Sequence, residues 1–594
     1  DRIPLNGAMQ QVQRLDGNEE AFRNAAFGNN DSPDNLSINA DWDSYWNTGS
    51  VKHHLKVGAQ YTLGWWDERE LRTGQLSWRP EEAPGVTFDA GDPSSWGFIS
   101  SDWGADINLV ARTTNAALYL QDYVTLSPRL SLSGGLRLNY FRGDLTPGDG
   151  SGSRFKATDD VKIAPRIGAT FVLLEDQGLV AKAHWGRYYQ NMFAQMFDRT
   201  IGGNVFTDLE FWDWVDPGLP VLDQTYTEAE RDQVFDLFLA IPLGEEVGPV
   251  EGWSQPYMDQ FIGGLEWEFA DDWKAGALYV NRRNRDIVSL VDRNQATNYT
   301  EVSGVSVLDV ATGDPVLNQD GDPLVLPSIF ISNEDIADFD QAVGGFFPEE
   351  LEALGLTAAE VAALTYDQEL VLTSSDARRE MDQVQVTVER AFRTWSVLAA
   401  VVWTNLRGDF FTVNGYADPR GSGAGPFVRP NARINFFGNM PNYSEWEVMV
   451  RAVGDLPANF RAGGFLTLSA GDFYTPVYRI DTRQHDFIGS NGTLLEPALF
   501  DAVAGSQMFL EQRGSRTLDQ LFRLDLHVDW TLKVRSVDWL FALDVFNVFN
   551  SGAVTEVKND VNNQDPNDAT TLFGATRFFQ NPRNIRLSAS LGIF

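Results

Sequence analysis

The sequence has no cysteine, comparatively few basic residues and no long hydrophobic run. Without cysteine, the chain has no disulfide scaffold, no thiolate metal site and no cysteine nucleophile. Its 594 residues include 46 Lys and Arg against 83 Asp and Glu, and the formal charge of −37 leaves no basic surface for nucleic acid. The longest apolar run, residues 397–403, is far shorter than the roughly 18–20 residues of a membrane-spanning helix. The sequence also opens without a basic and apolar leader, which predicts a processed product or a fragment.

What the sequence does contain is alternation of apolar and polar residues. In the clearest stretch, seven apolar residues alternate with six polar ones: Phe522, Leu524, Leu526, Val528, Trp530, Leu532 and Val534 against Arg523, Asp525, His527, Asp529, Thr531 and Lys533. Because successive side chains of a strand point to opposite faces, this pattern predicts strands with one apolar face. It recurs in 36–46, 130–139, 260–269, 445–451 and 537–545.

The lengths of the strands and of their connections favour a membrane barrel. Strands in soluble sandwiches average about 5–6 residues, whereas strands of about 10 residues or more with one apolar face are typical of a transmembrane β-barrel. Short turns, such as 48–50 and 456–458, alternate with long polar segments, such as 191–254 and 293–379. Short periplasmic turns and long external loops are the known asymmetry of outer-membrane barrels. We therefore expect an all-β, transmembrane antiparallel barrel.

Counting back from Phe594 predicts fifteen strands. Hairpins are expected near 36–66, 114–142, 158–190, 255–292, 380–408, 443–471 and 516–550, with a last strand at 581–594. Bacterial barrels normally have an even strand number, so we expect 1–35 to be an external segment and 36–594 a barrel portion. An open barrel would leave backbone groups unpaired in lipid. Missing strands must then come from another polypeptide or from residues outside this chain.

Much of the acidity lies in two of the long segments. Segment 191–254 has thirteen acids and two bases, and segment 293–379 has sixteen and three. This charge can hydrate the surface, repel polyanions or bind divalent cations. The run 318–322, NQDGD, makes Asp320 and Asp322 candidate calcium ligands, although it lacks the glutamate that completes an EF-hand. An Asp-Gly hairpin turn explains the same run.

The same long segments contain signals for short helices. Thr357 and Glu360 form a capping box, and Pro348 begins a segment with an acidic first turn. A third helix is predicted from Glu228 through Val234, Leu237 and Phe238. Such helices predict ordered loops that close over a ligand or pack on each other.

No constellation of residues indicates an enzyme or a cofactor site. His53 and His54 are adjacent, so a strand would send them to opposite faces and away from a shared metal. His184, His485 and His527 lie in different segments without a Ser/His/Asp spacing or a phosphate-binding glycine motif. We expect these side chains to be hydrogen-bonded in the lumen or in loops, and we expect no catalytic and no cofactor-binding residues.

Five passages carry motifs of one family. They are VKHHLKVG at 51–58, LYLQDY at 118–123 followed by PRLSLSGGLR at 128–137, APRIG at 164–168, GRYY at 186–189 and DVFNVFN at 544–550. In order and spacing the chain resembles the TonB-dependent outer-membrane receptors, specifically their Oar-like branch. The resemblance implies a bacterial outer-membrane barrel of 22 strands around a globular plug, with uptake of a scarce ligand powered by TonB. The fifteen strands expected here would be the last fifteen.

The resemblance implies partners that this sequence does not show. It implies the plug and the first strands, the TonB complex acting through that part, and outer-membrane lipid, with long loops external and the C-terminus periplasmic. A passive porin-like channel and a barrel-anchored adhesion or assembly protein are the alternatives. One departure concerns the last strand, where Ile585, Leu587, Leu591 and Ile593 are out of phase with Phe594. A bulge near Gly592, or an inward Phe594, would explain it.

Overall fold

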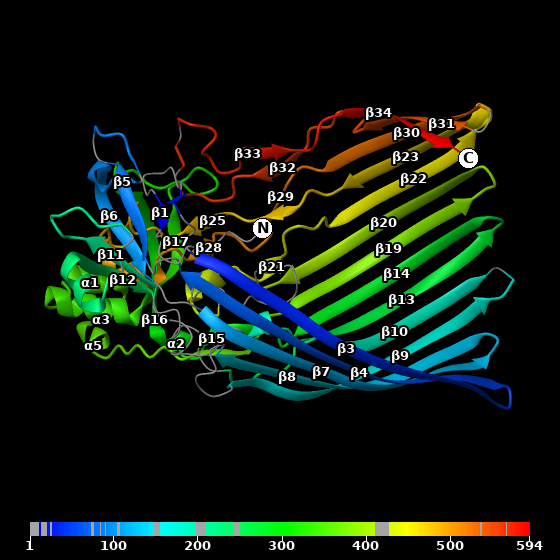
Figure 1. Ribbon diagram of the computed structural model, residues 1–594, viewed down its shortest axis with the longest axis horizontal. Helices are drawn as coiled ribbons and strands as arrows, with labels where there is room; N and C mark the ends of the chain where they lie inside the picture. The colour runs from blue at the N-terminus through cyan, green and yellow to red at the C-terminus, as the bar shows by residue number, and fades with distance from the viewer. Residues whose placement is uncertain are drawn as a thin grey trace.

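The structure is a broad curved sheet with a folded head at one end (Figure 1). It is a computed structural model that describes residues 11–13, 21–23, 27–72, 76–82, 85–89, 91–103, 107–147, 155–176, 178–197, 209–222, 224, 226–241, 250–409, 427–534, 537–562, 564–565 and 567–593. Short turns join the strands at the end of the sheet opposite the head, which we call the turn end. Among the helices of the described residues, none has the length and hydropathy to cross a membrane.

Among the described residues, fifteen strands follow one another along the sheet, each antiparallel to its neighbours. In spatial order they are β3 (Phe27–Thr48), β4 (Val51–Arg72), β7 (Ile107–Ser127), β8 (Leu130–Pro147), β9 (Phe155–Leu174), β10 (Leu179–Tyr189), β13 (Tyr257–Ala270), β14 (Trp273–Arg285), β19 (Arg379–Ala391), β20 (Trp395–Gly408), β22 (Trp446–Leu456), β23 (Phe460–Ser469), β30 (Leu521–Val534), β31 (Val537–Phe546) and β34 (Asn584–Ile593). The two-residue strand β21 (Gly438–Asn439) pairs with the end of β20. The predicted number of barrel strands and their hairpin order are confirmed.

The strand register places the apolar side chains on the outer face. Leu132 pairs with Ala169, Trp530 with Phe541, and Leu543 with Leu587, so apolar residues continue from strand to strand on one side. These side chains are exposed rather than packed in a core: 39% of Leu132 and 40% of Phe541 are accessible. In a water-soluble protein, exposing such an apolar surface to water would cost much free energy. In a bilayer, the same surface contacts lipid.

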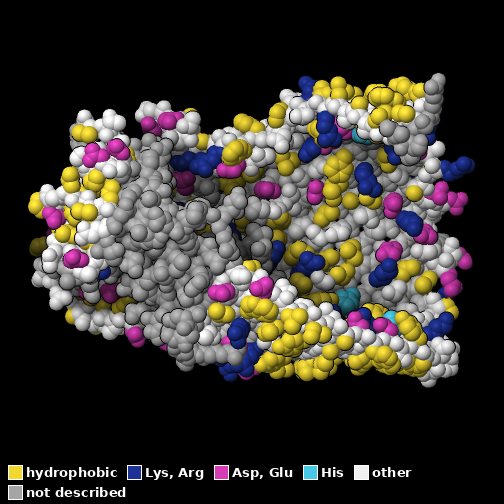
Figure 2. Space-filling model, viewed as in Figure 1, with side chains coloured by type: hydrophobic (Ala, Val, Ile, Leu, Met, Phe, Trp, Pro, Cys, Tyr) yellow, Lys and Arg dark blue, Asp and Glu magenta, His cyan; other side chains and the backbone are white. Residues whose placement is uncertain are grey.

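The opposite face of the sheet is polar and surrounds a hollow. Figure 2 shows Lys, Arg, Asp and Glu side chains inside this hollow, and hydrophobic side chains along the lower outer surface. In β30, Arg523, Asp525 and His527 alternate with Leu524, Leu526 and Val528, which continue the outward apolar side of the neighbouring strands. Period-two alternation thus separates a lipid-facing surface from a wet wall.

The sheet has two edges, β3 and β34. The path of paired strands begins at β3 and ends at β34, and within the described residues no further barrel strand pairs with either edge. Figure 1 shows the sheet curving between these edges without joining them. Unpaired backbone groups are costly in lipid, so each edge requires a partner strand in the membrane.

Long loops build the head, which contains several small sheets. A six-stranded sheet has the order β12 (Phe235–Ile241), β11 (Leu209–Trp214), β6 (Trp96–Trp103), β5 (Leu76–Glu82), β1 (Gln11–Gln13), β2 (Ala21–Arg23), and a four-stranded sheet has the order β17 (Val325–Ser332), β16 (Tyr299–Asp309), β26 (His485–Ile488), β27 (Leu494–Leu495). Pairs complete the loops: β15 (Val288–Asp292) with β18 (Leu370–Ser374), β24 (Phe473–Tyr474) with β29 (Arg516–Thr517), β25 (Val477–Arg479) with β28 (Gln507–Phe509), and β32 (Val554–Val557) with β33 (Thr576–Phe579).

The helices are short and belong to the loops and turns. They are α1 (Glu228–Val234), α2 (Gln295–Asn298), α3 (Asn333–Val343), α4 (Pro348–Leu354), α5 (Ala358–Val361) and the 3₁₀ helices η2 (Pro93–Ser95), η3 (Ala194–Met196), η4 (Pro430–Arg433), η5 (Pro457–Asn459) and η6 (Pro497–Val503). The capping box of Thr357 and Glu360 and the proline start at Pro348 are confirmed.

Two predicted element boundaries and one predicted bulge need correction, and the predicted direction of Phe594 lies outside the described residues. The first barrel strand begins at Phe27 rather than at residue 36, because its backbone stays paired with β4 beyond the apolar stretch. The helix from Glu228 ends at Val234, since the following residues pair with β11 as strand β12. The pairing of β31 with β34 is continuous through Gly592, so no bulge interrupts β34, and Phe594 lies outside the described residues.

The lipid-facing assignment predicts that arginine destabilises the barrel much more at one position of β19 than at the neighbouring position. Val386 is an outward side chain that is 44% exposed, whereas the inward Gln385 donates a hydrogen bond to Gln383. In lipid vesicles, Val386→Arg should lower the free energy of unfolding by about 2–4 kcal/mol, because it places a charge in the hydrocarbon. Urea titration followed by tryptophan fluorescence measures this change. Gln385→Arg is the matched control and should cost less than about 1 kcal/mol; equal losses would contradict the assignment.

Candidate functional site

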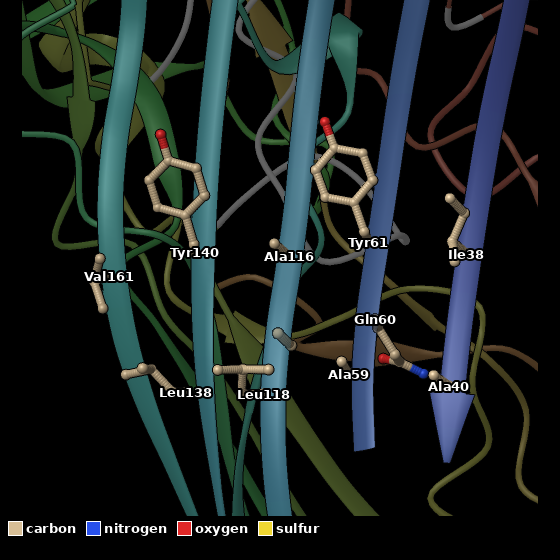
Figure 3. A pocket seen from close by; sticks show the side chains of 11 residues that line it. Ile38, Ala40, Ala59, Gln60, Tyr61, Ala116, Leu118, Leu138, Tyr140 and Val161 are labelled. Atoms are coloured by element: carbon tan, nitrogen blue, oxygen red, sulfur yellow. The ribbon is translucent and has the colours of Figure 1, made fainter.

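The outer face carries a shallow apolar groove that belongs to the lipid-facing surface. It has a volume of about 330 Å³ and crosses strands β3, β4, β7, β8 and β9 (Figure 3). Alanines form part of its floor, and Leu118, Leu138 and Val161 flank it. The rings of Tyr61 and Tyr140 stand on either side of Ala116 of β7, with both hydroxyls turned toward the same end of the barrel. The groove holds no charged side chain, so it offers hydrocarbon contact rather than recognition of a polar ligand.

Ion pairs within and between strands line much of the inner wall. Lys182 contacts Glu266 at 2.6 Å, Arg523 contacts Asp525 at 2.6 Å, and Arg586 contacts Asp544 at 2.9 Å. Charged groups at membrane depth are stable where they face a water-filled interior and pair with one another. The inner wall is therefore suited to contact a polar polypeptide or a polar solute.

The five histidines have hydrogen-bond partners. His54 faces the lumen and bonds Asp43 at 2.7 Å, whereas its neighbour His53 faces outward and bonds Asp122 at 2.8 Å. The other three bond different partners: His184 with Tyr188, His485 with Tyr478, and His527 with Asp544 and Asp529. The expectation that adjacent histidines point to opposite faces is confirmed. Within the described residues, no group of three His, Cys, Asp or Glu side chains is placed to hold a metal.

The head is held together by a core that several loops share. Residues from the β14–β19 loop, including Val305 and Ile336, pack with Phe487 and Phe500 of the β23–β30 loop and with Val561 of the β31–β34 loop. The rings of Phe487 and Phe500 stack with centroids 4.1 Å apart. Because loops far apart in sequence bury one another's apolar side chains, they form one ordered body rather than separate coils.

A second core of the head lies on the six-stranded sheet and is aromatic. Trp78, Trp96, Trp212, Tyr226 and Phe235 are all at least 92% buried, and Trp78 is inaccessible. Sequence reasoning missed this cluster. The only local signal was the density of aromatic residues in 211–214, which does not reveal a pairing with strands more than a hundred residues earlier.

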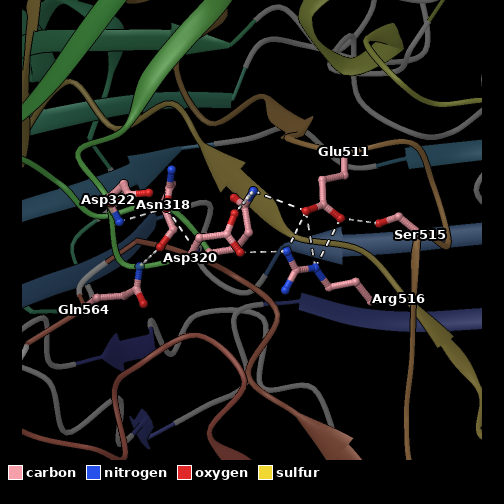
Figure 4. Close-up of polar contacts among 8 residues, drawn as sticks. Asn318, Asp320, Asp322, Glu511, Ser515, Arg516 and Gln564 are labelled. Atoms are coloured by element: carbon pink, nitrogen blue, oxygen red, sulfur yellow. Dashed lines mark hydrogen bonds and ion pairs between the residues drawn. The ribbon is translucent and has the colours of Figure 1, made fainter.

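Asp320 and Asp322, the predicted calcium ligands, lie in a tight hairpin turn of the head (Figure 4). The Asn318 side chain accepts hydrogen bonds from the backbone N–H groups of both residues, at 2.8 and 3.1 Å, and Gly321 has a φ of 84°. Arg516 bridges the Asp320 carboxylate, at 3.0 Å, and the Glu511 carboxylate, at 2.6 Å. A guanidinium thus occupies the position next to Asp320 where a cation would bind.

Asp335 has an unusual environment in the head. It lies in the first turn of α3, and its carboxylate accepts a hydrogen bond from the backbone N–H of Ala502 in η6 at 3.0 Å. Burial raises the pKa of Asp335 to about 7, and the nearby charges of Asp501, Glu334 and Asp338 act in the same direction while the Ala502 bond opposes them. The contact joins the β14–β19 loop to the β23–β30 loop.

Comparisons with known proteins agree with this architecture. Residues 6–291 match the family described as TonB dependent receptor-like, beta-barrel. The outer membrane transporter YddB from Escherichia coli has a similar structure, with a TM-score of 0.50 and 13% identity over 98% of this chain and 58% of that protein. The chain has the fold of a TonB-dependent receptor barrel. No curated protein matches its sequence.

Two further solved structures resemble the receptor barrel at lower TM-scores. The siderophore receptor PiuA from Acinetobacter baumannii has a TM-score of 0.43 and 11% identity over 95% of this chain and 57% of that protein. The ferric-catecholate import receptor Fiu from E. coli K12 has a TM-score of 0.44 and 12% identity over 95% of this chain and 55% of that protein. All three proteins are named as transporters or receptors and none as an enzyme. This chain spans between 55% and 58% of their lengths.

The half-buried carboxyl group of Asp335 makes the stability of the head pH-dependent. The pKa of Asp335 is about 7 in the folded chain against 3.8 for the free group, so between these values the unfolded chain releases a proton that the folded chain keeps. Stability of the head should therefore fall as pH rises from about 4 to about 7 and stay level above. Asp335→Asn should remove this slope and raise stability at pH 8 by about 2–4 kcal/mol at most.

Pulse proteolysis of the head in urea, at pH 5, 6, 7 and 8, measures this effect. Glu352→Gln is the control and should keep the wild-type slope, because Glu352 is an exposed residue of α4 whose charge is not among those that raise the pKa of Asp335. The same slope in Asp335→Asn as in the wild type would show that Asp335 does not titrate in this range.

Proposed function

We propose that this chain is the C-terminal barrel part of a TonB-dependent outer-membrane transporter that takes up a scarce ligand. The observation that carries the proposal is a sheet of fifteen barrel strands with an apolar outer face and a charged inner wall, whose first half matches the TonB-dependent receptor family. The head lies outside the cell, and β34 ends in the periplasm. Outer-membrane lipid contacts the outer face.

The two unpaired edges of the sheet support the proposal that further strands complete the barrel. β3 is a strand of 22 residues, and no strand covers its free side within the described residues. We infer that the first strands and a plug, from a further part of the polypeptide or from a separate chain, join β3 to β34 and fill the hollow. The TonB complex acts through that part, as in the Oar-like branch that the sequence motifs resemble.

The ordered head favours capture of a ligand over free passage. Its loops share apolar cores, and the ion pair of Arg516 with Asp320 joins two of them, so they form an ordered cover over the head end of the barrel. A passive porin-like channel would need an open path, and an adhesion protein would need only the anchor. The family match favours the transporter over both alternatives.

Binding to TonB tests the proposed function without knowledge of the ligand. The complete receptor and this chain alone are each purified and passed over immobilised C-terminal domain of TonB. We expect the complete receptor to be retained and this chain not to be, because the coupling segment belongs to the plug part. Failure of the complete receptor to bind TonB would refute energy-coupled transport.

Conductance separates the transporter from the passive channel. In planar bilayers the complete receptor should show no steady open current, because a plug fills the lumen. A stable ohmic conductance from the complete receptor would favour the porin-like alternative instead.

We keep calcium binding at Asp320 and Asp322 as a second proposal, beside the transport function. Because Arg516 already pairs with Asp320 and Glu511, a calcium ion would have to displace its guanidinium. Arg516→Gln should therefore tighten Ca²⁺ binding in isothermal titration, and Asp320→Asn in the same background should abolish it. Identical titrations of the wild type and both variants would exclude this turn as a calcium site.

A further inference from the structure

We infer that the inner wall of strands β4, β7, β8 and β9 carries an anion-binding site, which takes a carboxylate or phosphate group between Arg137 and Arg166. The inference rests on the proposed function in one respect, that this wall faces a wet lumen. It adds a site and a ligand chemistry that the fold alone does not specify.

The site is a pocket of about 260 Å³ with cations and no acid in its lining. Lys56, Arg137 and Arg166 line it together with Tyr119, Tyr123, Gln60 and Gln121, and no Asp or Glu is among the lining residues. Arg137 and Arg166 lie on neighbouring strands and face the same side, since Arg166 pairs in register with Gly135 and Arg137 with Ala164. In a chain of formal charge −37, a pocket lined by three cations is an exception to the overall composition.

The two arginines lack the carboxylate partners that several other inner-wall cations have. Lys182, Arg523 and Arg586 each contact an acid within 3 Å. In the part of the chain that the structure describes, neither Arg137 nor Arg166 contacts an acid, and their partners are neutral: Arg137 Nε donates to Asn139 at 2.7 Å, and the Arg166 guanidinium lies over the Tyr188 ring at 4.4 Å.

One donor of Arg166 is buried and unused. Arg166 Nε is inaccessible and has no hydrogen-bond acceptor among the described residues. A buried donor without an acceptor costs free energy, and a guanidinium at membrane depth without a counter-ion costs more. An anion in the pocket supplies the missing counter-ion, because a planar carboxylate or a phosphate can accept hydrogen bonds from two guanidinium groups at once.

The backbone around the arginines leaves room for this anion. Gly135 lies opposite Arg166, and a Cβ atom at this position would approach the Leu120 carbonyl oxygen and the Gln121 side chain to 3.2–3.3 Å. A larger residue would thus crowd the floor of the pocket. Lys56 adds a third positive charge, which Asp41 only partly offsets at 3.7 Å. The site therefore selects for charge and for small size.

The absence of cysteine makes a charge-selective labelling experiment possible. Gln121→Cys places a single thiol in the pocket, and Gln385→Cys places one on the inner wall of β19, where the neighbouring inward side chains Leu278 and Val402 are apolar. Each variant of the full chain, in lipid vesicles, reacts with an anionic and with a cationic methanethiosulfonate reagent. We expect the anionic-to-cationic rate ratio at position 121 to exceed that at 385 by about tenfold at low ionic strength.

Neutral substitutions identify the groups responsible. Arg137→Gln with Arg166→Gln should bring the ratio at position 121 to within about twofold of the control site, whereas Arg523→Gln, which removes an inner-wall arginine with an acidic partner, should leave it unchanged. A ratio at 121 equal to that at 385 in the unsubstituted background would overturn the anion site and leave the wet lumen intact. Failure of either reagent to reach positions 121 and 385 would instead overturn the wet lumen and the proposed function with it.

Protection of the introduced thiol in the Gln121→Cys variant distinguishes the sources of the anion. In the isolated chain, citrate or inorganic phosphate should slow the anionic reagent in a saturable way, and no such protection would count against the site. In cells with the complete receptor, protection that persists after free anions are washed out indicates an acidic side chain of the polypeptide in the lumen. Protection that citrate or phosphate must restore indicates a free solute.

Discussion

The structure depends on the pairing of backbone hydrogen bonds in a medium without water. A strand in lipid must give each N–H and C=O group a partner on a neighbouring strand, and its side chains must then alternate between lipid and lumen. Pairs such as Trp530 with Phe541 and Leu132 with Ala169 continue the apolar surface around the sheet. The same requirement leaves β3 and β34 as edges that need covering. The outer surface, the charged wall and the inferred partner strands follow from this one constraint.

The head obeys a different constraint, because its strands stand beyond the lipid and need an apolar core of their own. No single loop supplies that core: Ile336, Phe500 and Val561 come from three loops and meet in one cluster. Ion pairs such as Arg516 with Asp320, and the hydrogen bond from Ala502 to Asp335, join the same loops. The head should therefore form or loosen as a unit, which is a property that a cover over a ligand requires.

The barrel can be predicted from sequence because its signal is local. Alternation over 522–534 and short turns such as 48–50 locate strands without any knowledge of their neighbours, and the fifteen strands appear in the expected order. Capping boxes are local too, which is why α4 and α5 are predictable. Helix α3 is absent from the sequence-based expectations although Ser332 caps it and Gly344, at a φ of 76°, ends it, so an available signal was overlooked. The helix predicted from Glu228 to Phe238 is too long. The spacing of Leu237 and Phe238 suits a helix, but these residues belong to strand β12, which pairs with β11.

The features that most concern function cannot be predicted from the sequence, because they depend on contacts between residues far apart in the chain. Arg516 and Asp320 lie 196 positions apart. The run NQDGD alone therefore does not predict that a guanidinium pairs with Asp320 in this turn. The same holds for Arg137 and Arg166, where the informative fact is the lack of an acid nearby. Spin-label scanning of 522–530 in vesicles tests the central claim most directly. Labels at Leu524, Leu526 and Val528 should be relaxed by oxygen, and labels at Arg523, Asp525 and His527 by an aqueous nickel reagent. Equal exposure of both sets to the nickel reagent would contradict a lipid-facing outer surface.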